Sequence, residues 1–334
     1  RMWSDTSKAQ PVLVTGGAGF IGSRLVRLLA TAGHRVRVLD DLTTGRAESV
    51  ASLPGVTLDR GSVLDPDAVA RSAHGTRLVL HLAGIVGMRL ATGQAEHAYA
   101  VGHHGTANVL AHSGDTPVVL VSSSAVYGLS DSTAALRDDV PVDRSVPLAY
   151  DSGTPGYATG KWEMERLGRE ASRHRPVLVV RPFNVVGPGQ RGRYGMVLPT
   201  FLRQATTGGP LTVHGDGTQR RCFTDVDQFT RRLLELTDTD AAWQPDANVV
   251  NIGSTTETSI GDLARLVLDA TGSTADVVHV PYESVFPGRT DVTGRVPRLD
   301  RLTAAVGETE WLSAASLVRK TAQARRAGSM SATR

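Results

Sequence analysis

A glycine-rich turn near the N-terminus restricts the fold of this chain more than any other feature. An apolar run over residues 11–15 leads into Gly16-Gly-Ala-Gly19-Phe20-Ile21-Gly22, and leucines at helical spacing follow. This order predicts a strand, a tight turn and a helix whose first N–H groups point at a phosphate. Glycines at 16, 19 and 22 let the backbone approach a pyrophosphate and let the helix pack closely on the strand. The segment therefore predicts a dinucleotide-binding domain.

The end of the next expected strand favours NAD as the dinucleotide. Residues 34–39, His-Arg-Val-Arg-Val-Leu, are expected to form this strand, and Asp40 and Asp41 follow directly. Asp40 lies 18 residues after Gly22, where a carboxylate accepts hydrogen bonds from the adenosine ribose and repels a 2′-phosphate. Arg46 lies close enough in sequence to weaken this preference, although an exposed loop arginine is the better explanation of it.

The remaining pattern predicts an α/β fold, a Rossmann doubly wound parallel sheet with a smaller C-terminal substrate-binding lobe. Apolar and amphipathic stretches alternate from residue 11 to about 181, which is typical of such sheets. Further strands are expected at 56–58, 78–82, 117–122 and 177–181, and helices near 65–74, 92–113 and 156–174. Residues 129–155 are polar and rich in Asp, Ser and Pro, which predicts a loop over the site.

These elements divide the chain into two lobes. The NAD-binding domain is expected to span residues 10–184, and residues 222–255 are expected to return to it. Residues 185–320 should form most of the substrate-binding lobe, which is therefore discontinuous. Residues 325–334 are expected to be a disordered tail.

Composition excludes several classes of protein. With 40% hydrophobic residues in 334 positions, the chain can bury a large core, and no apolar run is long enough to span a bilayer. Cys222 is the only cysteine, which excludes an internal disulfide and a cysteine metal cluster, so we expect no bound metal. The formal charge of +3 gives no reason to expect a nucleic-acid partner. A cytoplasmic enzyme fits these features.

Tyr157 and Lys161 form the clearest catalytic signal. The chain holds 36 Lys and Arg residues, and only positions 8, 161 and 320 are lysine. On a helix, a spacing of four residues places both side chains on one face, so the ammonium can favour the phenolate. Tyr157 is then a candidate for proton transfer near neutral pH. The alternative is a helical pair without a catalytic role, whose tyrosine packs in the core.

Eight ordered blocks make the chain similar to a known family. They are TGGAGFIG (15–22), LDD (39–41), HLAG (81–84), SSSAVYG (122–128), YATGK (157–161), RPFNVVGPGQ (181–190), GDGTQRRCF (215–223) and RVPRLDRL (295–302). With these blocks the chain resembles the extended short-chain dehydrogenase/reductase family, in particular its NAD-dependent nucleotide-sugar epimerases and dehydratases.

The resemblance implies a role for each catalytic residue. Ser123 would hydrogen-bond the sugar oxygen at the reacting carbon, and Tyr157 would be the acid/base. Lys161 would bind the nicotinamide ribose and lower the pKa of Tyr157. Hydride would then pass from the sugar to NAD, giving a transient 4-keto sugar and NADH.

The resemblance also implies contacts to the cofactor and the nucleotide-diphosphate sugar. Besides the catalytic residues, cofactor contacts are expected at Gly16, Gly19, Phe20, Ile21, Gly22, Asp40, Asp41, Ser62, Val63, Leu82, Ala83 and Pro182. Substrate contacts are expected at Ser123, Ser124, Asn184, Val197, Arg221 and Arg289. Arg295 is the second choice, after Arg289, for the further arginine that binds the diphosphate.

The fate of the keto sugar separates the members of this family. Family dehydratases carry an Asp-Glu pair where this chain has Ser124 and Ala125, so elimination of water would lack its acid and base. Family decarboxylases tend to keep a Glu at the position of Ala125. A 4-epimerase is therefore the simplest reading, with an NDP-uronate decarboxylase or an NDP-ketosugar reductase as alternatives. A dinucleotide sensor without catalysis would not need the residues Ser123, Tyr157 and Lys161.

The resemblance finally implies a homodimer, formed through a four-helix bundle of the helices near 92–113 and 156–174 of each subunit. Further positions depart from the family pattern. Ser62 replaces the Asp of the family's Gly-Asp-Ile contact to adenine, so a carboxylate is lost there. Gly102 stands where the family usually has Asn, Cys222 where it has Asp, and Asp225 where it has Tyr. Cys222 is expected to be a buried apolar residue and not a nucleophile.

Overall fold

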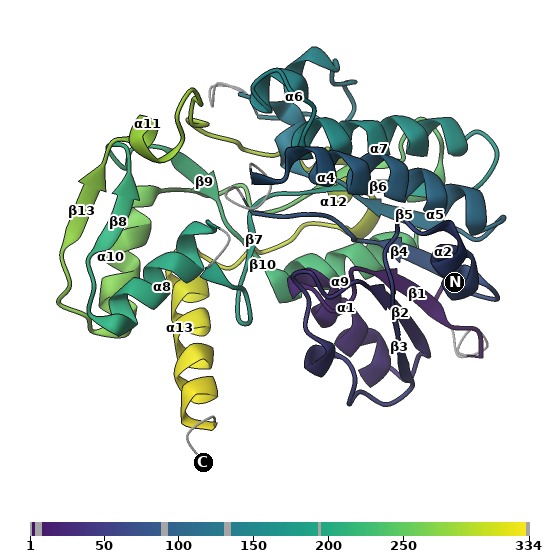
Figure 1. Ribbon diagram of the computed structural model, residues 1–334, viewed down its shortest axis with the longest axis horizontal. Helices are drawn as coiled ribbons and strands as arrows, with labels where there is room; N and C mark the ends of the chain where they lie inside the picture. The colour runs from purple at the N-terminus through teal and green to yellow at the C-terminus, as the bar shows by residue number, and fades with distance from the viewer. Residues whose placement is uncertain (1, 4–8, 88–92, 130–134, 193–194, 332–334) are drawn as a thin grey trace.

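A seven-stranded parallel sheet forms the centre of the molecule (Figure 1). The computed structural model describes all residues except 1, 4–8, 88–92, 130–134, 193–194 and 332–334. The strand order is β11-β6-β5-β4-β1-β2-β3, so the expected Rossmann sheet is confirmed. Its strands are β1 (Val12–Thr15), β2 (Val36–Asp40), β3 (Val56–Arg60), β4 (Leu78–His81), β5 (Val118–Val121), β6 (Val177–Pro182) and β11 (Val249–Ile252). Strand order reverses between β1 and β4, where sheets of this kind bind their ligands.

Helices bury both faces of this sheet. Within β1, Val12 and Val14 belong to the core on one face, and Leu13 belongs to the core on the other. The first face is covered by α1 (Phe20–Thr31), α9 (Val226–Thr237) and α12 (Asp300–Val306). The second is covered by α2 (Pro66–Ala73), α4 (Ala95–Ala100), α5 (Thr106–His112) and α7 (Tyr157–Ala171). Burial on both faces explains why the strands read as continuous apolar runs.

A second lobe with its own core follows β6 in the chain. It contains α8 (Val197–Thr207), β8 (Leu211–His214), α10 (Ile260–Thr271), β13 (Val277–Val280), α11 (Tyr282–Val285) and α13 (Ala314–Ser331). The short strands β7 (Val185–Val186) and β10 (Thr224–Asp225) pair between the two lobes, and β9 (Arg220–Cys222) pairs with β12 (Glu257–Ser259). Among the described residues, no helix has the length and apolar character needed to cross a membrane.

The helix expected over 92–113 is interrupted by a π-helical segment, Val101–Gly105, between α4 and α5. Here Gly102 packs against Gly160 of α7, and a Cβ at Gly102 would lie 2.8 Å from the Gly160 carbonyl carbon. The two backbones therefore meet where a side chain such as the family's Asn would not fit without a shift. This close contact positions α7, the helix that begins at Tyr157.

The C-terminal helix differs from the expected disordered tail. α13 continues to Ser331, so residues 325–331 are helical, and residues 332–334 lie outside the described part. Leu317, Val318 and Ala322 are buried in the core of the second lobe. Arg326 Nη2 then donates hydrogen bonds to the carbonyls of Ala270 and Thr271, at the C-terminus of α10. These contacts hold the end of α13 against α10 and the core of the second lobe, although its sequence alone predicts no such packing.

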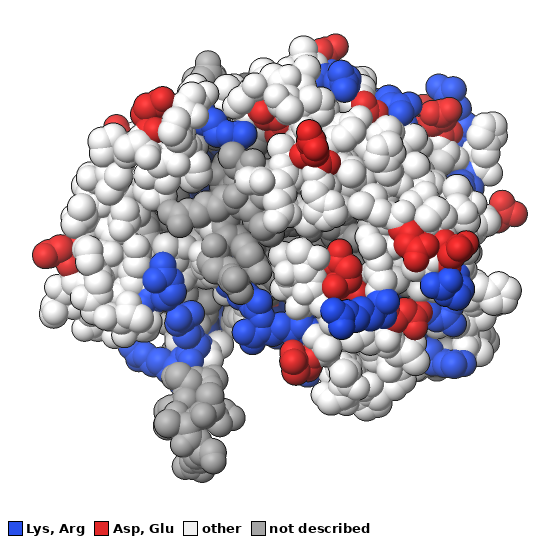
Figure 2. All heavy atoms as spheres, viewed as in Figure 1, with Lys and Arg blue, Asp and Glu red and all other residues white. Residues whose placement is uncertain are grey.

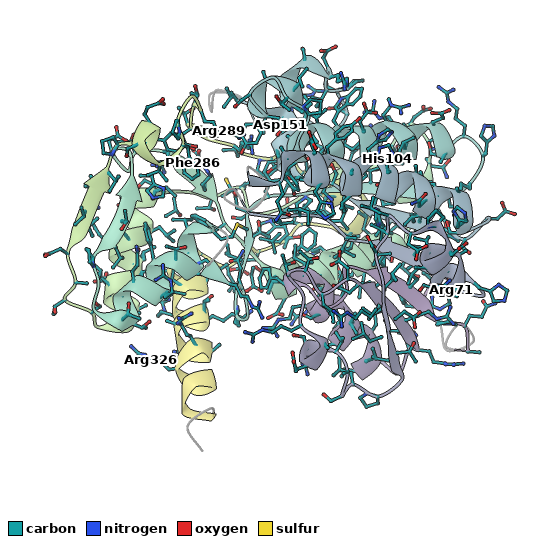
Figure 3. The ribbon with its side chains drawn as sticks, viewed as in Figure 1. Arg71, His104, Asp151, Phe286, Arg289 and Arg326 are labelled. Carbon is teal, nitrogen blue, oxygen red and sulfur yellow. The ribbon has the colours of Figure 1, made fainter. Side chains whose placement is uncertain are left out.

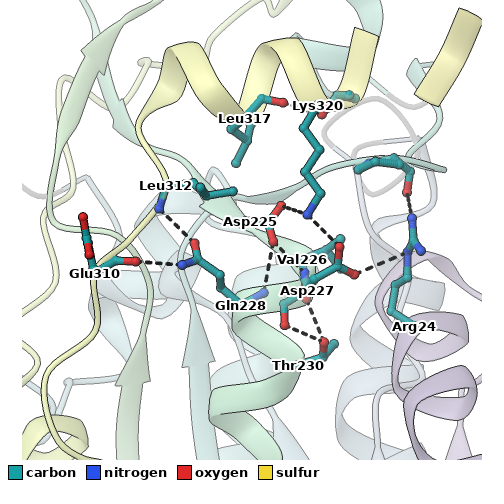
Figure 4. Close-up of polar contacts among 12 residues, drawn as sticks. Arg24, Asp225, Val226, Asp227, Gln228, Thr230, Glu310, Leu312, Leu317 and Lys320 are labelled. Atoms are coloured by element: carbon teal, nitrogen blue, oxygen red, sulfur yellow. Dashed lines mark hydrogen bonds and ion pairs between the residues drawn. The ribbon is translucent and has the colours of Figure 1, made fainter. Parts of the chain in front are cut away.

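Lys320 of α13 ties the second lobe to the Rossmann domain (Figure 4). Its ammonium donates to Asp225 Oδ2 at 2.7 Å and to Asp227 Oδ2 at 2.6 Å. Asp225 also caps α9 by accepting from the N–H groups of Asp227 and Gln228. The departure from the family's Tyr at Asp225 thus coincides with one of the chain's three lysines.

Candidate active site

One cavity of about 1110 Å³ lies between the two lobes, at the C-terminal ends of β1, β2, β4, β5 and β6. The structure brings every site residue expected from the sequence to its wall. These are Gly16, Gly19, Phe20, Ile21, Gly22, Asp40, Asp41, Ser62, Val63, Leu82, Ala83, Ser123, Ser124, Tyr157, Lys161, Pro182, Asn184, Val197, Arg221 and Arg289. The first eleven gather at the Rossmann end, Val197 begins α8 of the second lobe, and Arg221 lies in β9.

The glycine turn gives the cavity a wall without side chains. Gly16 has φ of +66°, and a Cβ at Gly22 would lie 2.2 Å from the Gly16 carbonyl oxygen. Any side chain at Gly22 would therefore push the turn away from α1. The turn leaves the N-terminus of α1 open to the cavity, as a pyrophosphate requires.

Asp40 anchors the other end of this wall. Its carboxylate accepts hydrogen bonds from the N–H groups of Ala18 at 2.9 Å and Leu42 at 2.8 Å. Burial raises the pKa of Asp40, and these two hydrogen bonds oppose the rise. A carboxylate held at the end of β2, beside a bare glycine turn, fits the ribose and pyrophosphate of NAD.

The three catalytic candidates come together at the ends of β5 and α7. Ser123 begins the short 3₁₀ turn Ser124–Tyr127 after β5, and its hydroxyl accepts from the N–H of Ala125 at 3.1 Å. The same hydroxyl is hydrogen-bonded to the phenol of Tyr157, the first residue of α7. Lys161 lies one turn further, with Nζ 6.0 Å from the centre of the Tyr157 ring. Its ammonium donates to the carbonyl of Val121 at 2.8 Å.

The electrostatics of this group differ in part from expectation. Burial raises the pKa of Tyr157, and the hydrogen bond from Ser123 acts in the opposite direction. Burial also lowers the pKa of Lys161 to about 8, which the charge of Glu165 partly offsets. The expected lowering of the Tyr157 pKa by Lys161 is thus opposed by desolvation of both groups.

Arginines line the opposite side of the cavity. Arg221 of β9 is held by an ion pair with Asp291 at 2.8 Å and by the carbonyl of Val292 at 2.6 Å. Arg295 is 8% exposed, donates to the carbonyl of Gly128, and lies 5.0 Å from the centre of the Tyr150 ring. Figure 3 places Arg289 beside Phe286 on the second lobe. Of the two candidates for the further arginine, Arg295 is the more enclosed.

More basic side chains surround the opening of the cavity. Figure 2 shows Lys and Arg side chains gathered along the lower edge, between the two lobes. Basic residues of the cavity wall near the glycine turn and the second lobe are Arg24, Arg27, Arg46, Arg191 and Arg203. This charge favours the approach of an anionic ligand.

Sequence reasoning missed two features of the site. The first is Tyr150 and its neighbour Asp151, which come from α6 (Ser145–Tyr150) and its C-terminal end, inside the stretch expected to be a loop. The second is a buried ion pair behind the catalytic residues, between Glu165 of α7 and Arg181 of β6. Glu165 is four residues after Lys161, on the same face of α7, and Arg181 is a charged residue in an apolar strand. Both positions could have indicated a buried ion pair.

His81, the residue before Leu82 of the cavity wall, and Asn184 of that wall are both held by hydrogen bonds to neighbouring residues. His81 is buried between the hydroxyls of Thr15 at 2.7 Å and Thr106 at 3.2 Å. Burial lowers its pKa to about 3, so it is neutral at physiological pH. Asn184 has φ of +37° and donates from Nδ2 to the carbonyl of Cys222 at 3.1 Å.

The thiol of Cys222 is expected to be unreactive in the folded protein. Its side chain is fully buried, and burial raises its pKa to about 12. Since the thiolate is the reactive form, we expect less than a tenth of one thiol to react with Ellman's reagent at pH 8 within minutes. One full thiol should react after unfolding in guanidinium chloride. Rapid modification of the native protein would contradict the burial of Cys222.

Comparisons with known proteins agree with this geometry. The family model described as "NAD dependent epimerase/dehydratase family" matches residues 12–253. The chain is 33% identical to the UDP-N-acetyl-alpha-D-glucosaminuronate decarboxylase of Bacillus cytotoxicus, over 87% of this chain and 89% of that protein. It is 32% identical to the UDP-glucose 4-epimerase of Azospirillum brasilense, over 70% of this chain and 71% of that protein. Among solved structures, an epimerase of Methanothermobacter thermautotrophicus matches with a TM-score of 0.85 and 25% identity, over 98% of this chain and 96% of that one.

Proposed function

Because this chain belongs to the NAD-dependent epimerase/dehydratase family, we propose that it is a nucleotide-diphosphate-sugar 4-epimerase that forms a transient 4-keto sugar. The family uses NAD and includes epimerases, decarboxylases and dehydratases of NDP-sugars. These activities can share oxidation of the sugar at C4 as a first step. What distinguishes them is the chemistry of the ketone that follows.

The residues of the site support the shared first step. Bound NAD supplies the acceptor, and later the donor, of the hydride. Tyr157 takes the proton from the 4-hydroxyl, and Ser123 holds that oxygen by a hydrogen bond while the carbonyl forms. Lys161 donates a hydrogen bond to the carbonyl of Val121, which holds its positive charge close to the phenol of Tyr157. Tyr157 returns the proton when the ketone is reduced again.

The observation that favours epimerisation is that every carboxylate on the described cavity wall already takes part in a hydrogen bond or an ion pair within the protein. These carboxylates belong to Asp40, Asp41, Asp151 and Asp291. Asp291 pairs with Arg221, and the other three accept hydrogen bonds from backbone N–H groups. Elimination of water needs an acid and a base beside the sugar, and Ala125 offers neither. Return of the hydride to the other face of the ketone needs no further side chain.

A decarboxylase is the second candidate, and two observations favour it. One is the 33% identity to a UDP-sugar-uronate decarboxylase along most of both chains. The other is Arg295, a buried cation near Tyr150 and Tyr157 that could pair with a sugar carboxylate. A 4-keto uronate is a β-keto acid, which loses carbon dioxide without a general base at C5.

Product analysis tests the proposal. The purified enzyme would be incubated without added cofactor, and again with NAD, against UDP-, dTDP-, GDP- and ADP-sugars that include a uronate. We expect a product of unchanged mass with an inverted C4 proton coupling in its NMR spectrum. Loss of carbon dioxide would establish the decarboxylase, and loss of water would overturn the argument from Ala125. Turnover only with a ketosugar and reduced cofactor would make the enzyme a reductase.

Replacing Arg221 with Met is expected to weaken binding of the nucleotide diphosphate. Loss of hydrogen bonds from a guanidinium to a phosphate should raise the Kd about 10- to 100-fold. The Kd for UDP and the other nucleoside diphosphates can be measured by calorimetry. Arg220→Met is the control, since Arg220 is the adjacent residue of β9 and is exposed, and its Kd should match that of the wild type. Equal Kd values for all three proteins would exclude Arg221 from the diphosphate site.

The expected homodimer also remains a proposal. Its bundle would consist of α4, α5 and α7 of each subunit, which lie side by side in Figure 1. Light scattering should then give twice the chain mass of 35.4 kDa, whereas a monomer mass would refute the proposal.

A further inference from the structure

The carboxylate of Asp151 closes the N-terminus of the catalytic helix. It accepts hydrogen bonds from the N–H groups of Thr159 at 2.7 Å, Gly156 at 3.0 Å and Ala158 at 3.2 Å. Asp151 is 8% exposed, and it borders the cavity next to α7. The label in Figure 3 marks its place where α6 meets α7.

α7 depends on this carboxylate because it has no cap of its own. Its N-cap residue is Gly156, which has no side chain to accept the free N–H groups of the first turn. The loop from Asp151 to Gly156 bends back through left-handed residues, with φ of 63° at Ser152 and 81° at Gly153. A Cβ at Gly156 would lie 3.3 Å from Asp151 Cγ, so the loop fits tightly around the carboxylate.

Tyr157 lies within this capped first turn. Some groups around its phenol favour the phenolate, and others favour the protonated form. The charge of Arg295 favours the phenolate. The helix N-terminus and an ammonium as near as that of Lys161, 6.0 Å from the ring centre, act in the same direction. The negative charge of Asp151 and the phenol of Tyr150 favour the protonated form. Ser123 donates a hydrogen bond that favours the phenolate. Asp151 is thus a carboxylate whose charge acts directly on the phenol of Tyr157.

We propose that Asp151 is a positioning residue, which fixes Tyr157 at the start of α7 and whose charge sets the pH at which the phenol gives up its proton. The proposal rests on the proposed role of Tyr157 as acid/base. A cap with no other role would stabilise α7 but leave the proton affinity of Tyr157 unchanged. The two cases differ in a titration, which needs no sugar substrate.

The test compares Asp151→Asn and Asp151→Ser with the wild type, each loaded with NAD. Asn removes the charge at nearly constant shape, and Ser keeps a short hydroxyl acceptor for the cap if the Asn variant fails to fold. Tyrosines labelled with ¹³C at Cζ would be titrated by NMR, and Tyr157→Phe identifies the signal among the six tyrosines. Asp65→Asn is the matched control, since Asp65 caps α2 through the N–H groups of Asp67 and Ala68 and is not part of the described cavity wall.

Loss of the charge should lower the titration midpoint of Tyr157 by about one pH unit. The acid limb of the kcat profile should move down by the same amount, with KM nearly unchanged. Asp151→Glu, which restores the charge, should recover most of the shift. Asp65→Asn should lower the Tm without moving the midpoint. A midpoint that stays within 0.2 units in Asn and Ser variants, whatever the loss in Tm, would overturn the proposal. If no panel sugar reacts, the proposed function fails, yet the titration still decides the role of Asp151.

Discussion

Replacing Tyr157 with Phe is expected to lower kcat by about 10²- to 10⁴-fold, which is the usual contribution of a positioned acid/base. The change removes one oxygen and keeps the aromatic ring, so the packing of α7 should persist. Ser123 and Lys161 remain in place. The hydroxyl of Ser123 is a far weaker base than a phenolate, and Lys161, with its pKa lowered to about 8, is mostly protonated at pH 7 and so mostly lacks the electron pair needed to accept the proton of the 4-hydroxyl. Because binding of the nucleotide diphosphate depends on the other side of the cavity, the Kd for UDP-type ligands should change less than about threefold.

The measurement is the rate of product formation on the sugar identified in the panel, together with the Tm and the NAD content of the purified protein. Tyr99→Phe is the control, since Tyr99 of α4 packs beside His103 and His104 outside the cavity wall described above. It should keep at least half of the wild-type kcat. A Tyr157→Phe enzyme with more than a tenth of the wild-type kcat would remove Tyr157 from the acid/base role.

Local sequence patterns were sufficient to predict the Rossmann half of the fold. The glycine turn at Gly16–Gly22 is encoded by residues that touch one another along the chain, and Asp40 follows from the length of the next helix and strand. Parallel strands buried on both faces read directly as apolar runs. No contact between distant segments is needed to recognise either feature.

The parts that sequence did not predict depend on such distant contacts. The π-helical segment at Val101–Gly105 coincides with the meeting of Gly102 and Gly160, which lie 58 residues apart. The helical end of α13 depends on Arg326 reaching the carbonyls of α10. In both cases the contacting residue lies in a distant segment, which the local sequence does not reveal. The π-helical interruption between α4 and α5 and the helical end of α13 were therefore not predicted.

The same distinction applies to the site. Motif residues such as Ser123 and Tyr157 were expected, and they line one cavity. Asp151 was missed because its role depends on the fold of the loop that returns it to α7. Arg295 was only the second choice for a diphosphate contact, since one arginine among so many carries little signal until its burial is seen. Burial also raises the pKa of Tyr157, which spacing alone could not reveal.

Breaking the buried ion pair behind the site should cost more stability than breaking an exposed one. Glu165 and Arg181 are 0% and 1% exposed, and the guanidinium donates two hydrogen bonds to the carboxylate, at 2.8 and 2.6 Å. Ser122 donates to the same carboxylate at 2.6 Å, and Arg181 donates to Tyr127 at 2.8 Å. Glu165→Gln leaves the arginine charge buried without its counter-ion. We expect a loss of about 3–5 kcal/mol in the free energy of unfolding, measured in urea at pH 7.

Glu170→Gln provides the control on the same helix. Glu170 pairs with Arg166 at 3.5 Å, and the two side chains are 69% and 44% exposed, so the change should cost less than about 1 kcal/mol. The double variant Glu165→Met, Arg181→Met should recover part of the loss, because it removes both charges from the core together. A loss below about 1 kcal/mol for Glu165→Gln would mean that water or a rearranged Tyr127 satisfies the arginine. A loss of the expected size, recovered in the double variant, would mean that the cost comes from leaving the charge of Arg181 buried without its counter-ion. Glu165 lies one turn after Lys161 in α7, so the catalytic turn and the stability of the fold would then depend on the same helix.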